Sequence, residues 1–315
     1  MDMDLKTRDE VDLGEVAAVV KRTNPLAAGR EIAQIEAALD AIQERHPSDF
    51  ILEAREEGIL IGWLSFRKTT ATMGEMGRWQ PHVLNVSAKE TVFCRLLHSL
   101  TDEAGRRGIR RIEVGYGRIS VEVLDIYDER AAWLEAEGFH KLEDNLFMAC
   151  SLSGCELTIP PLPDTMTLQC LSTVPSDDLF RCYAESFSES EHRQFFDFTP
   201  GPIREAFDGY FDLTVPYDDD ASLVLAADGR VVGFSLIRPR TNEAHLEMFG
   251  LHPDFRGMGL GKTLLRTSMR TVFDEGTERM TLGVDAVNVP AVALYEKTGF
   301  ERVSRMVVHS WKHDD

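Results

Sequence analysis

Residues 244–266 read AHLEMFGLHPDFRGMGLGKTLLR, and this stretch decides how the second half of the chain folds. An apolar run ends at Pro253, a turn follows, and the helical spacing of apolar residues begins near Lys262. A strand, a turn and a helix in this order aim several backbone amides at one place, where the positive end of the helix dipole attracts an anion. The turn contains Gly257, Gly259 and Gly261, which have no Cβ to obstruct a phosphate. With the positive charges of Arg256 and Lys262, the stretch predicts a turn that binds a pyrophosphate.

Two other kinds of glycine-rich phosphate loop do not fit this turn. A Walker loop needs a glycine five places before Gly261, at the position that Arg256 holds. A dinucleotide GxGxxG that begins at Gly257 needs its third glycine where Lys262 stands. A flexible surface turn without a ligand remains as the alternative.

Upstream of this turn, the chain shows the same order of elements twice. In the first half, periodicity predicts helices within 11–45, 89–105 and 128–137, strands at 109–114 and 145–152, and a hairpin that turns at Glu57 and Gly58. In the second half it predicts a helix at 176–188 and a hairpin that turns at Asp228 and Gly229. The proline-rich segment IPPLPD, residues 159–164, is the expected linker between the two halves.

Short segments of the two halves can be laid over each other. AWLEAEGF, which ends at Phe139, matches ALYEKTGF, which ends at Phe300, and LLHSL matches LLRTS. In the same register AKETVF, residues 88–93, lies opposite RGMGLG without a glycine, and Leu134 lies opposite Tyr295. The pattern indicates an internal repeat whose first copy keeps the fold and lacks the phosphate turn. Two unrelated α/β domains with similar helix ends are the alternative.

Composition narrows the classes of function. The chain has 315 residues and a formal net charge of −19, so its mean field repels nucleic acids and anionic membranes. No segment is long and apolar enough to span a bilayer, and the start MDMDLKTRDE is acidic, unlike a signal peptide, so we expect a cytoplasmic protein. Five cysteines include no CxxC pair, which predicts reduced thiols and no metal site. One sequence leaves open whether the protein is a monomer or a homodimer.

A family resemblance rests on two motifs in the second half. RGMGLG resembles the R/QxxGxG/A acyl-CoA signature of the GNAT (Gcn5-related N-acetyltransferase) superfamily. About thirty residues on, NVPAVALYEKTGF resembles its next motif through Asn288, Pro290, Ala291, Leu294, Tyr295, Gly299 and Phe300. The resemblance implies an α/β fold of two tandem GNAT-like domains, each a twisted mixed sheet flanked by helices. It places a degenerate domain at 1–158 and a catalytic domain at 165–315, a layout similar to that of tandem members such as mycothiol synthases.

Amine acylation by a thioester needs a base for the amine, a polarised carbonyl and a proton for the departing thiolate. His245 and Glu247 alternate on one face of the strand before the turn, so both are candidate bases. The resemblance places the family's usual base at His245, and Glu247 stands where similar arylalkylamine N-acetyltransferases have a second histidine, which leaves open which of the two dominates. It also makes Tyr295 the general acid, and a hydroxyl with an ordinary pKa near 10 suits protonation of a thiolate. A solvated strand face and a core tyrosine are the structural alternatives.

The resemblance further implies acetyl-CoA as the acyl donor and no metal. GNAT proteins lay pantetheine between two splayed strands, so a strand amide near Phe249–Leu251 is expected to hold the thioester carbonyl. Asn288 is expected to cap the following helix and to lie close to the cofactor. The expected cofactor-binding residues are Phe249, Gly250, Leu251, Arg256, Gly257, Met258, Gly259, Leu260, Gly261, Lys262, Asn288, Ala291 and Tyr295.

The acceptor is expected to be a primary amine on a small molecule or peptide. Acids and aromatics gather in residues 188–212, where GNAT domains build the acceptor wall: Glu189, Glu191 and Asp197 beside Phe195, Phe196 and Phe198. An amphipathic helix with a solvated acidic face explains the same run. The main hypothesis is a working N-acetyltransferase. The alternatives are acetylation of an amino sugar thiol, as in mycothiol synthases, and a regulatory module that binds acyl-CoA without turnover.

Overall fold

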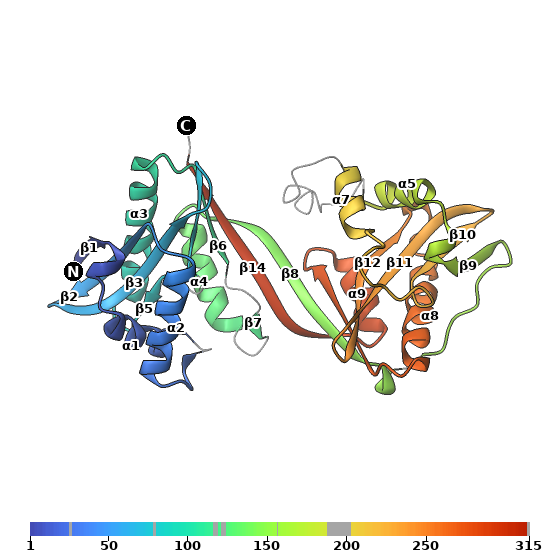
Figure 1. Cartoon of the computed structure of the whole chain (residues 1–315), viewed down its shortest axis with the longest axis horizontal. Helices are drawn as coiled ribbons and strands as arrows, with labels where there is room; N and C mark the ends of the chain where they lie inside the picture. The colour runs from blue at the N-terminus through green and yellow to red at the C-terminus, as the bar shows by residue number, and fades with distance from the viewer. Residues whose placement is uncertain are drawn as a thin grey trace. The chain divides into compact units, whose positions relative to one another are not determined.

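A computed structural model describes residues 1–24, 27–77, 80–115, 119–120, 124–155, 157–187 and 203–313, with the side chains of 124–127 left out. Contacts between Cα atoms divide the chain into two compact units. The first unit comprises Met1–Asp144 and Arg305–Asp315, and the second comprises Asn145–Ser304. Each unit is a mixed sheet with helices on both faces, which confirms the α/β fold class (Figure 1).

The sheet of the first unit has the order β1-β2-β3-β4-β6-β14. Its strands are β1 (Asp2–Lys6), β2 (Phe50–Glu56), β3 (Ile59–Lys68), β4 (Met73–Met76), β6 (Arg111–Gly115) and β14 (Glu301–Lys312), with β5 (His82–Val83) on β3 and β7 (Ile119–Ser120) on β14. Helices α1 (Leu13–Thr23) and α2 (Ile32–Arg45) cover one face, and α3 (Lys89–Arg106) and α4 (Leu124–Ala136) cover the other. Only β4 and β6 pair in parallel among the pairings described for this sheet.

The sheet of the second unit has the order β8-β13-β12-β11-β10-β9. Its strands are β8 (His140–Ser151), β9 (Met166–Cys170), β10 (Leu223–Ala227), β11 (Arg230–Arg240), β12 (Glu243–Leu251) and β13 (Arg279–Asp285). Helices α5 (Ser176–Phe187) and α7 (Ile203–Tyr210) cover one face, and α8 (Leu260–Asp274) and α9 (Val289–Lys297) cover the other. Short 3-10 helices lie at Arg8–Glu10 (η1), Leu152–Gly154 (η4), Leu171–Thr173 (η5) and Pro253–Phe255 (η6).

Both hairpins turn where the sequence predicts. Glu57 and Gly58 have φ of 52° and 82°, and Asp228 and Gly229 have φ of 49° and 81°. Positive φ at both central residues is the geometry of the tight two-residue turn that matches the twist of the flanking strands. The hairpins β2–β3 and β10–β11 are therefore encoded locally.

Each half of the sequence contributes its last strand to the sheet of the other unit. Residues 145–151 of β8 pair with β13, and residues 308–312 of β14 pair with β6 (Figure 1, β14 in red beside β6). The compact units therefore differ from the sequence boundaries 1–158 and 165–315. Strand partners far apart in the chain leave no local mark in the sequence, which is why periodicity finds these strands and not their neighbours.

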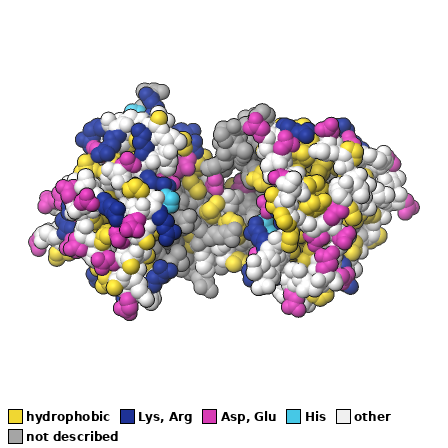
Figure 2. Space-filling view, viewed as in Figure 1, with side chains coloured by type: hydrophobic (Ala, Val, Ile, Leu, Met, Phe, Trp, Pro, Cys, Tyr) yellow, Lys and Arg dark blue, Asp and Glu magenta, His cyan; other side chains and the backbone are white. Residues whose placement is uncertain are grey.

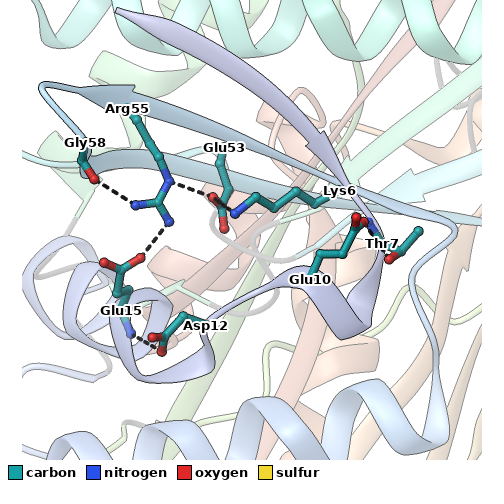
Figure 3. A network of polar contacts seen from close by, with 8 residues as sticks. All are labelled: Lys6, Thr7, Glu10, Asp12, Glu15, Glu53, Arg55 and Gly58. Carbon is teal, nitrogen blue, oxygen red and sulfur yellow. Dashed lines mark hydrogen bonds and ion pairs between the residues drawn. The ribbon is translucent and has the colours of Figure 1, made fainter.

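A buried carboxylate ties β2 to its surroundings in the first unit (Figure 3). Glu53 is fully buried, and its Oε2 lies 2.8 Å from Lys6 Nζ and 2.9 Å from Arg55 Nε. Arg55 Nη2 donates to Glu15 Oε2 at 2.6 Å, and the side chain of Asp12 caps α1. The network joins β1, β2 and α1 through charged hydrogen bonds. On the face shown in Figure 2, basic and acidic side chains are interspersed over this unit.

The cysteines depart in part from the sequence-based expectation. Cys150 and Cys155 are joined as a disulfide, whereas Cys94, Cys170 and Cys182 are free thiols. The expectation of five reduced thiols is therefore wrong for this pair, whose members are five positions apart in the sequence. In the described part of the chain, no group of three or more His, Cys, Asp or Glu side chains could hold a metal ion, and no helix has the length and apolar character of a membrane span.

Candidate active site

An irregularity in β12 places the two candidate bases. The antiparallel register with β11 shifts between Leu236 and Ile237, whose partners are Met248 and Leu246. Glu247 is thereby left as the extra residue of a β-bulge, a feature that re-aims side chains and often lies next to active sites. His245 Nε2 lies 3.9 Å from Glu247 Oε2, so the two residues that the sequence singled out lie side by side.

Both candidate bases have further polar partners. His245 is 8% exposed, and its Nδ1 lies 3.0 Å from Thr281 Oγ1 on β13. Glu247 is less buried, with 26% of its side chain exposed, and its Oε2 lies 3.6 Å from Arg240 Nη2. A carboxylate beside an imidazole stabilises the positive charge that the ring acquires when it takes a proton. The pair can therefore accept a proton and hold the resulting charge.

Next to this pair, β12 and β13 diverge. Their parallel register covers only Ala244–Leu246 against Met280–Leu282, although both strands continue. The other edge of β12 pairs with β11 as far as Leu251, and the other edge of β13 pairs with β8 as far as Asp285. In the described residues, each strand thus has one edge without a strand neighbour. An extended chain can add to such an edge through backbone hydrogen bonds.

The glycine turn lies where β12 ends. Gly257 and Gly259 have φ of 76° and 81°, and a Cβ added at either would meet nothing within 4 Å. Helix α8 begins at Leu260, so the amides of Leu260 and Gly261 lie in its first turn, where backbone donors have no partner within the helix. Donors and space thus coincide at a positive helix end, as the sequence predicts for an anion site.

Arg256 braces this turn from within. Its Nε donates to the Leu251 carbonyl at 3.1 Å, and its Nη2 donates to the Ser186 carbonyl at 2.6 Å. These bonds hold the turn against the ends of β12 and α5, while the positive charge stays next to the glycines. His252 fixes the start of η6, since its Nδ1 accepts from the Asp254 amide at 3.2 Å.

Gly250 has a packing reason of its own. A Cβ at this position would lie 2.3 Å from Cζ of Phe234, so the ring of Phe234 occupies the space that a side chain would need. Gly261 is less constrained, because its nearest neighbour, Leu294 Cδ2, would lie at 3.4 Å. The expected role of Gly250 in binding a cofactor therefore stands beside a structural one.

Tyr295 and Asn288 belong to α9. Tyr295 is 5% exposed, and its ring lies edge-on to those of Phe249 and Phe300, at centroid distances of 6.3 and 5.9 Å. Burial raises the pKa of Tyr295, so its hydroxyl keeps its proton at neutral pH. The side chain of Asn288 accepts from the Ala291 amide at 3.2 Å, which confirms the expected helix cap.

Comparison with known proteins finds a family model that matches this part of the chain. Residues 177–300 match the sequence model of the Acetyltransferase (GNAT) family. The match covers less than half of the chain and spans β10 to β13, the glycine turn and helix α9.

Two curated relatives match about half of the chain. A mycothiol acetyltransferase of Saccharomonospora viridis is 30% identical over 189 residues, which are 56% of this chain and 59% of that protein. A mycothiol acetyltransferase of Salinispora tropica is 33% identical over 157 residues, 47% of this chain and 48% of that protein. The chain thus spans about half the length of these relatives.

A solved structure shares the fold of nearly the whole chain. A GCN5-related N-acetyltransferase from Sphaerobacter thermophilus aligns with a TM-score of 0.51 at 16% identity, covering 98% of this chain and 95% of that one. At this identity the likeness concerns the fold alone. The likeness extends over both units, and the residues of the two sequence motifs lie in the second.

The structure of the second unit adds polar residues that sequence reasoning missed. Thr281 and Arg240 contact the two candidate bases, and Glu243 accepts from Thr281 Oγ1 at 3.3 Å. Glu243 could have been noticed as the acid two places before His245, but the contact of Thr281 depends on the register between β12 and β13. The proposed acceptor residues Glu189, Glu191, Phe195, Phe196, Asp197 and Phe198 lie outside the described residues.

An aromatic cluster lies between α5, α7 and β11. The ring of Tyr183 on α5 packs against those of Phe187, Phe207, Phe211 and Phe234, at centroid distances of 4.9 to 6.2 Å. Burial raises the pKa of Tyr183, and its hydroxyl has no hydrogen-bond partner among the described residues. This cluster forms a rigid base on the same face of the sheet as α5 and α7.

Proposed function

We propose that the second unit is an N-acetyltransferase that moves an acetyl group from acetyl-CoA to a primary amine by direct attack. The observation that carries the proposal is the position of His245 and Glu247. They lie on β12 where it diverges from β13, and β12 leads through η6 into the glycine turn. A base, an open strand edge and an anion-binding turn in sequence are what amine acylation requires. The match of residues 177–300 to the acetyltransferase family supports it.

The residues present suit coenzyme A. The turn from Arg256 to Lys262 offers amides and positive charge for the pyrophosphate, and the free edge of β12 from Phe249 to Leu251 offers backbone partners for an extended pantetheine arm. When bound, acetyl-CoA supplies an acyl group activated as a thioester. Asn288, Ala291 and Tyr295 would line its thiol end from α9.

We assign separate roles to the ionisable residues. His245 accepts the proton of the attacking amine at Nε2, and Glu247 stabilises the charge that results, because its carboxylate lies 3.9 Å from that nitrogen. The hydroxyl of Tyr295 holds a proton for the departing sulfur, since a phenol in a buried site stays neutral. The greater burial of His245 and its contact with Thr281 favour it over Glu247 as the base.

A second acceptor class has one observation in its favour. Relatives at 30% and 33% identity are mycothiol acetyltransferases, which supports acetylation of an amino sugar thiol. The same base and acid would serve this acceptor, because the reacting group is again a primary amine. Only the wall that recognises the rest of the acceptor would differ.

The test is thiol release from acetyl-CoA in the presence of an amine panel that includes amino sugars bearing thiol groups. We expect release with at least one amine, and a fall in kcat for Tyr295→Phe with coenzyme A binding retained. Tyr217→Phe is the matched control, because Tyr217 lies in the same unit and outside the site. Tight binding of coenzyme A without release for any amine would indicate a binding module instead.

A further inference from the structure

A chain of polar contacts begins at His245. His245 Nδ1 lies 3.0 Å from Thr281 Oγ1, which lies 3.3 Å from Glu243 Oε1 and 3.4 Å from the Ala244 carbonyl. At the far end, Glu243 Oε2 lies 3.4 Å from Arg279 Nε. The contacts connect neighbouring positions of two paired strands, since His245 and Thr281 are partners in the parallel register.

Counting protons along this chain leaves two arrangements, which differ in the nitrogen of neutral His245 that carries the proton. Thr281 has a single hydroxyl proton, while an ionised Glu243 and the Ala244 carbonyl can only accept. If the hydroxyl proton goes to one of these acceptors, Thr281 Oγ1 can only accept from His245. The contact at 3.0 Å then requires a proton on Nδ1, which leaves the lone pair of the neutral ring on Nε2.

We propose that Thr281 is a positioning residue that holds neutral His245 in the Nδ1–H tautomer, so that Nε2 is the nitrogen that takes the proton. The proposal rests on the proposed function for its catalytic meaning, and on the contact geometry alone for the tautomer. Glu243 orients the hydroxyl of Thr281, and Arg279 orients Glu243. The logic is that of a carboxylate behind a catalytic histidine, with one hydroxyl interposed.

The proton path balances along this chain. An amine proton moves to Nε2, whose lone pair forms the new N–H bond, and the ring becomes a cation with protons on both nitrogens. The Nδ1 proton stays between His245 and Thr281 Oγ1, and the positive ring lies beside the carboxylate of Glu247. When the imidazolium later releases the Nε2 proton to water, the same tautomer returns.

The tautomer can be measured without turnover. In the full chain labelled with ¹⁵N-histidine, long-range ¹H–¹⁵N spectra at a pH where the ring is neutral report which nitrogen carries the proton, and the loss of signals in His245→Gln assigns them. We expect His245 to show a protonated Nδ1 in the wild type and in Thr281→Ser. We expect Thr281→Val, which cannot accept a hydrogen bond, to shift the population to Nε2–H. Thr267→Val, a matched change on α8, should leave the spectrum unchanged.

Kinetics with the acceptor from the amine panel supply the second readout. Thr281→Val should lower kcat by at least about 10-fold with little change in KM for acetyl-CoA, and Thr281→Ser should restore it. An Nε2–H tautomer in the wild-type protein, or a Thr281→Val spectrum like that of the wild type, would overturn the assignment. Failure of the proposed function is distinct, because it abolishes thiol release and leaves the tautomer spectra as they are.

Discussion

His245 Nε2 and Glu247 Oε2 lie 3.9 Å apart, and Glu247 is the extra residue of a β-bulge in β12. The bulge also coincides with the end of pairing between β12 and β13, which stops at Leu246. The ionisable pair and the unpaired edge of β12 therefore lie at the same local irregularity. In the proposed mechanism, proton transfer and thioester binding both depend on this part of β12.

Substitution of the pair separates the base from its partner. His245→Gln should lower kcat/KM by about 10²- to 10⁴-fold, the usual contribution of a general base, and Glu247→Gln should lower it by about 10-fold. Glu247→Gln should retain the acid limb of the pH–rate profile, and His245→Gln should lose it. Steady-state kinetics from pH 5 to about 9 check this. A larger loss in Glu247→Gln, with the limb kept in His245→Gln, would make Glu247 the base.

The raised pKa of Glu275, just after the end of α8, should make stability depend on pH. Burial, a hydrogen bond with Asp218 and the charges of Asp218 and Asp220 raise the pKa of Glu275 to about 7. In the unfolded chain this carboxyl has a pKa of about 4.3. Between about pH 4.3 and about pH 7 the folded state therefore binds more protons than the unfolded state, so the free energy of unfolding falls as the pH rises through this window. We expect Glu275→Gln to raise Tm relative to the wild type at pH 8 and not at pH 4.

Calorimetry at the two pH values measures this difference. Glu278→Gln, the same change at a nearby exposed position, serves as the control. It should leave Tm unchanged at both pH values. Equal Tm values for Glu275→Gln and the wild type at pH 8 would show that Glu275 titrates as an ordinary carboxyl.

The exchanged strand β14 is anchored in the first unit by an ion pair. Arg305 Nε and Nη2 donate to the two carboxylate oxygens of Asp144, both at 2.5 Å, and Asp144 is 6% exposed. Burial by itself raises the pKa of Asp144, but the hydrogen bonds and charge of Arg305, with help from Lys141, lower it overall. Asp144→Asn should therefore destabilise the first unit by about 3 kcal/mol at neutral pH.

The sign of the pH effect follows from the lowered pKa. The contribution of Asp144 is present above the unfolded value of about 3.9 and is lost as the pH falls through the folded pKa, so the variant and the wild type should converge in acid. Urea unfolding followed by tryptophan fluorescence tests both points, with Asp164→Asn at an exposed site as control. A constant difference between the two proteins down to pH 2 would contradict the role of this ion pair.

Sequence alone predicts the locally encoded parts of this molecule. Residues close together in the sequence form the hairpin turns at Glu57 and Asp228, the glycine turn and the helix cap at Asn288. The structure confirms these features. The partner of His245 and the exchange of β8 and β14 depend on register between distant strands. Side-chain alternation shows which face a residue takes and gives no information about its neighbour across the sheet. Thr281 was missed for this reason.

The central claim is that the amides of the glycine turn in the second unit bind coenzyme A. Calorimetric titration of coenzyme A into the full chain, the Gly259→Ala variant and the control Gly209→Ala tests it most directly, because a Cβ at φ of 81° strains the turn at Gly259 while Gly209 lies in α7. We predict one site per chain in the wild type and the control, and at least about 10-fold weaker binding in Gly259→Ala. Binding that is absent from the wild type, or equally tight in Gly259→Ala, would contradict the account.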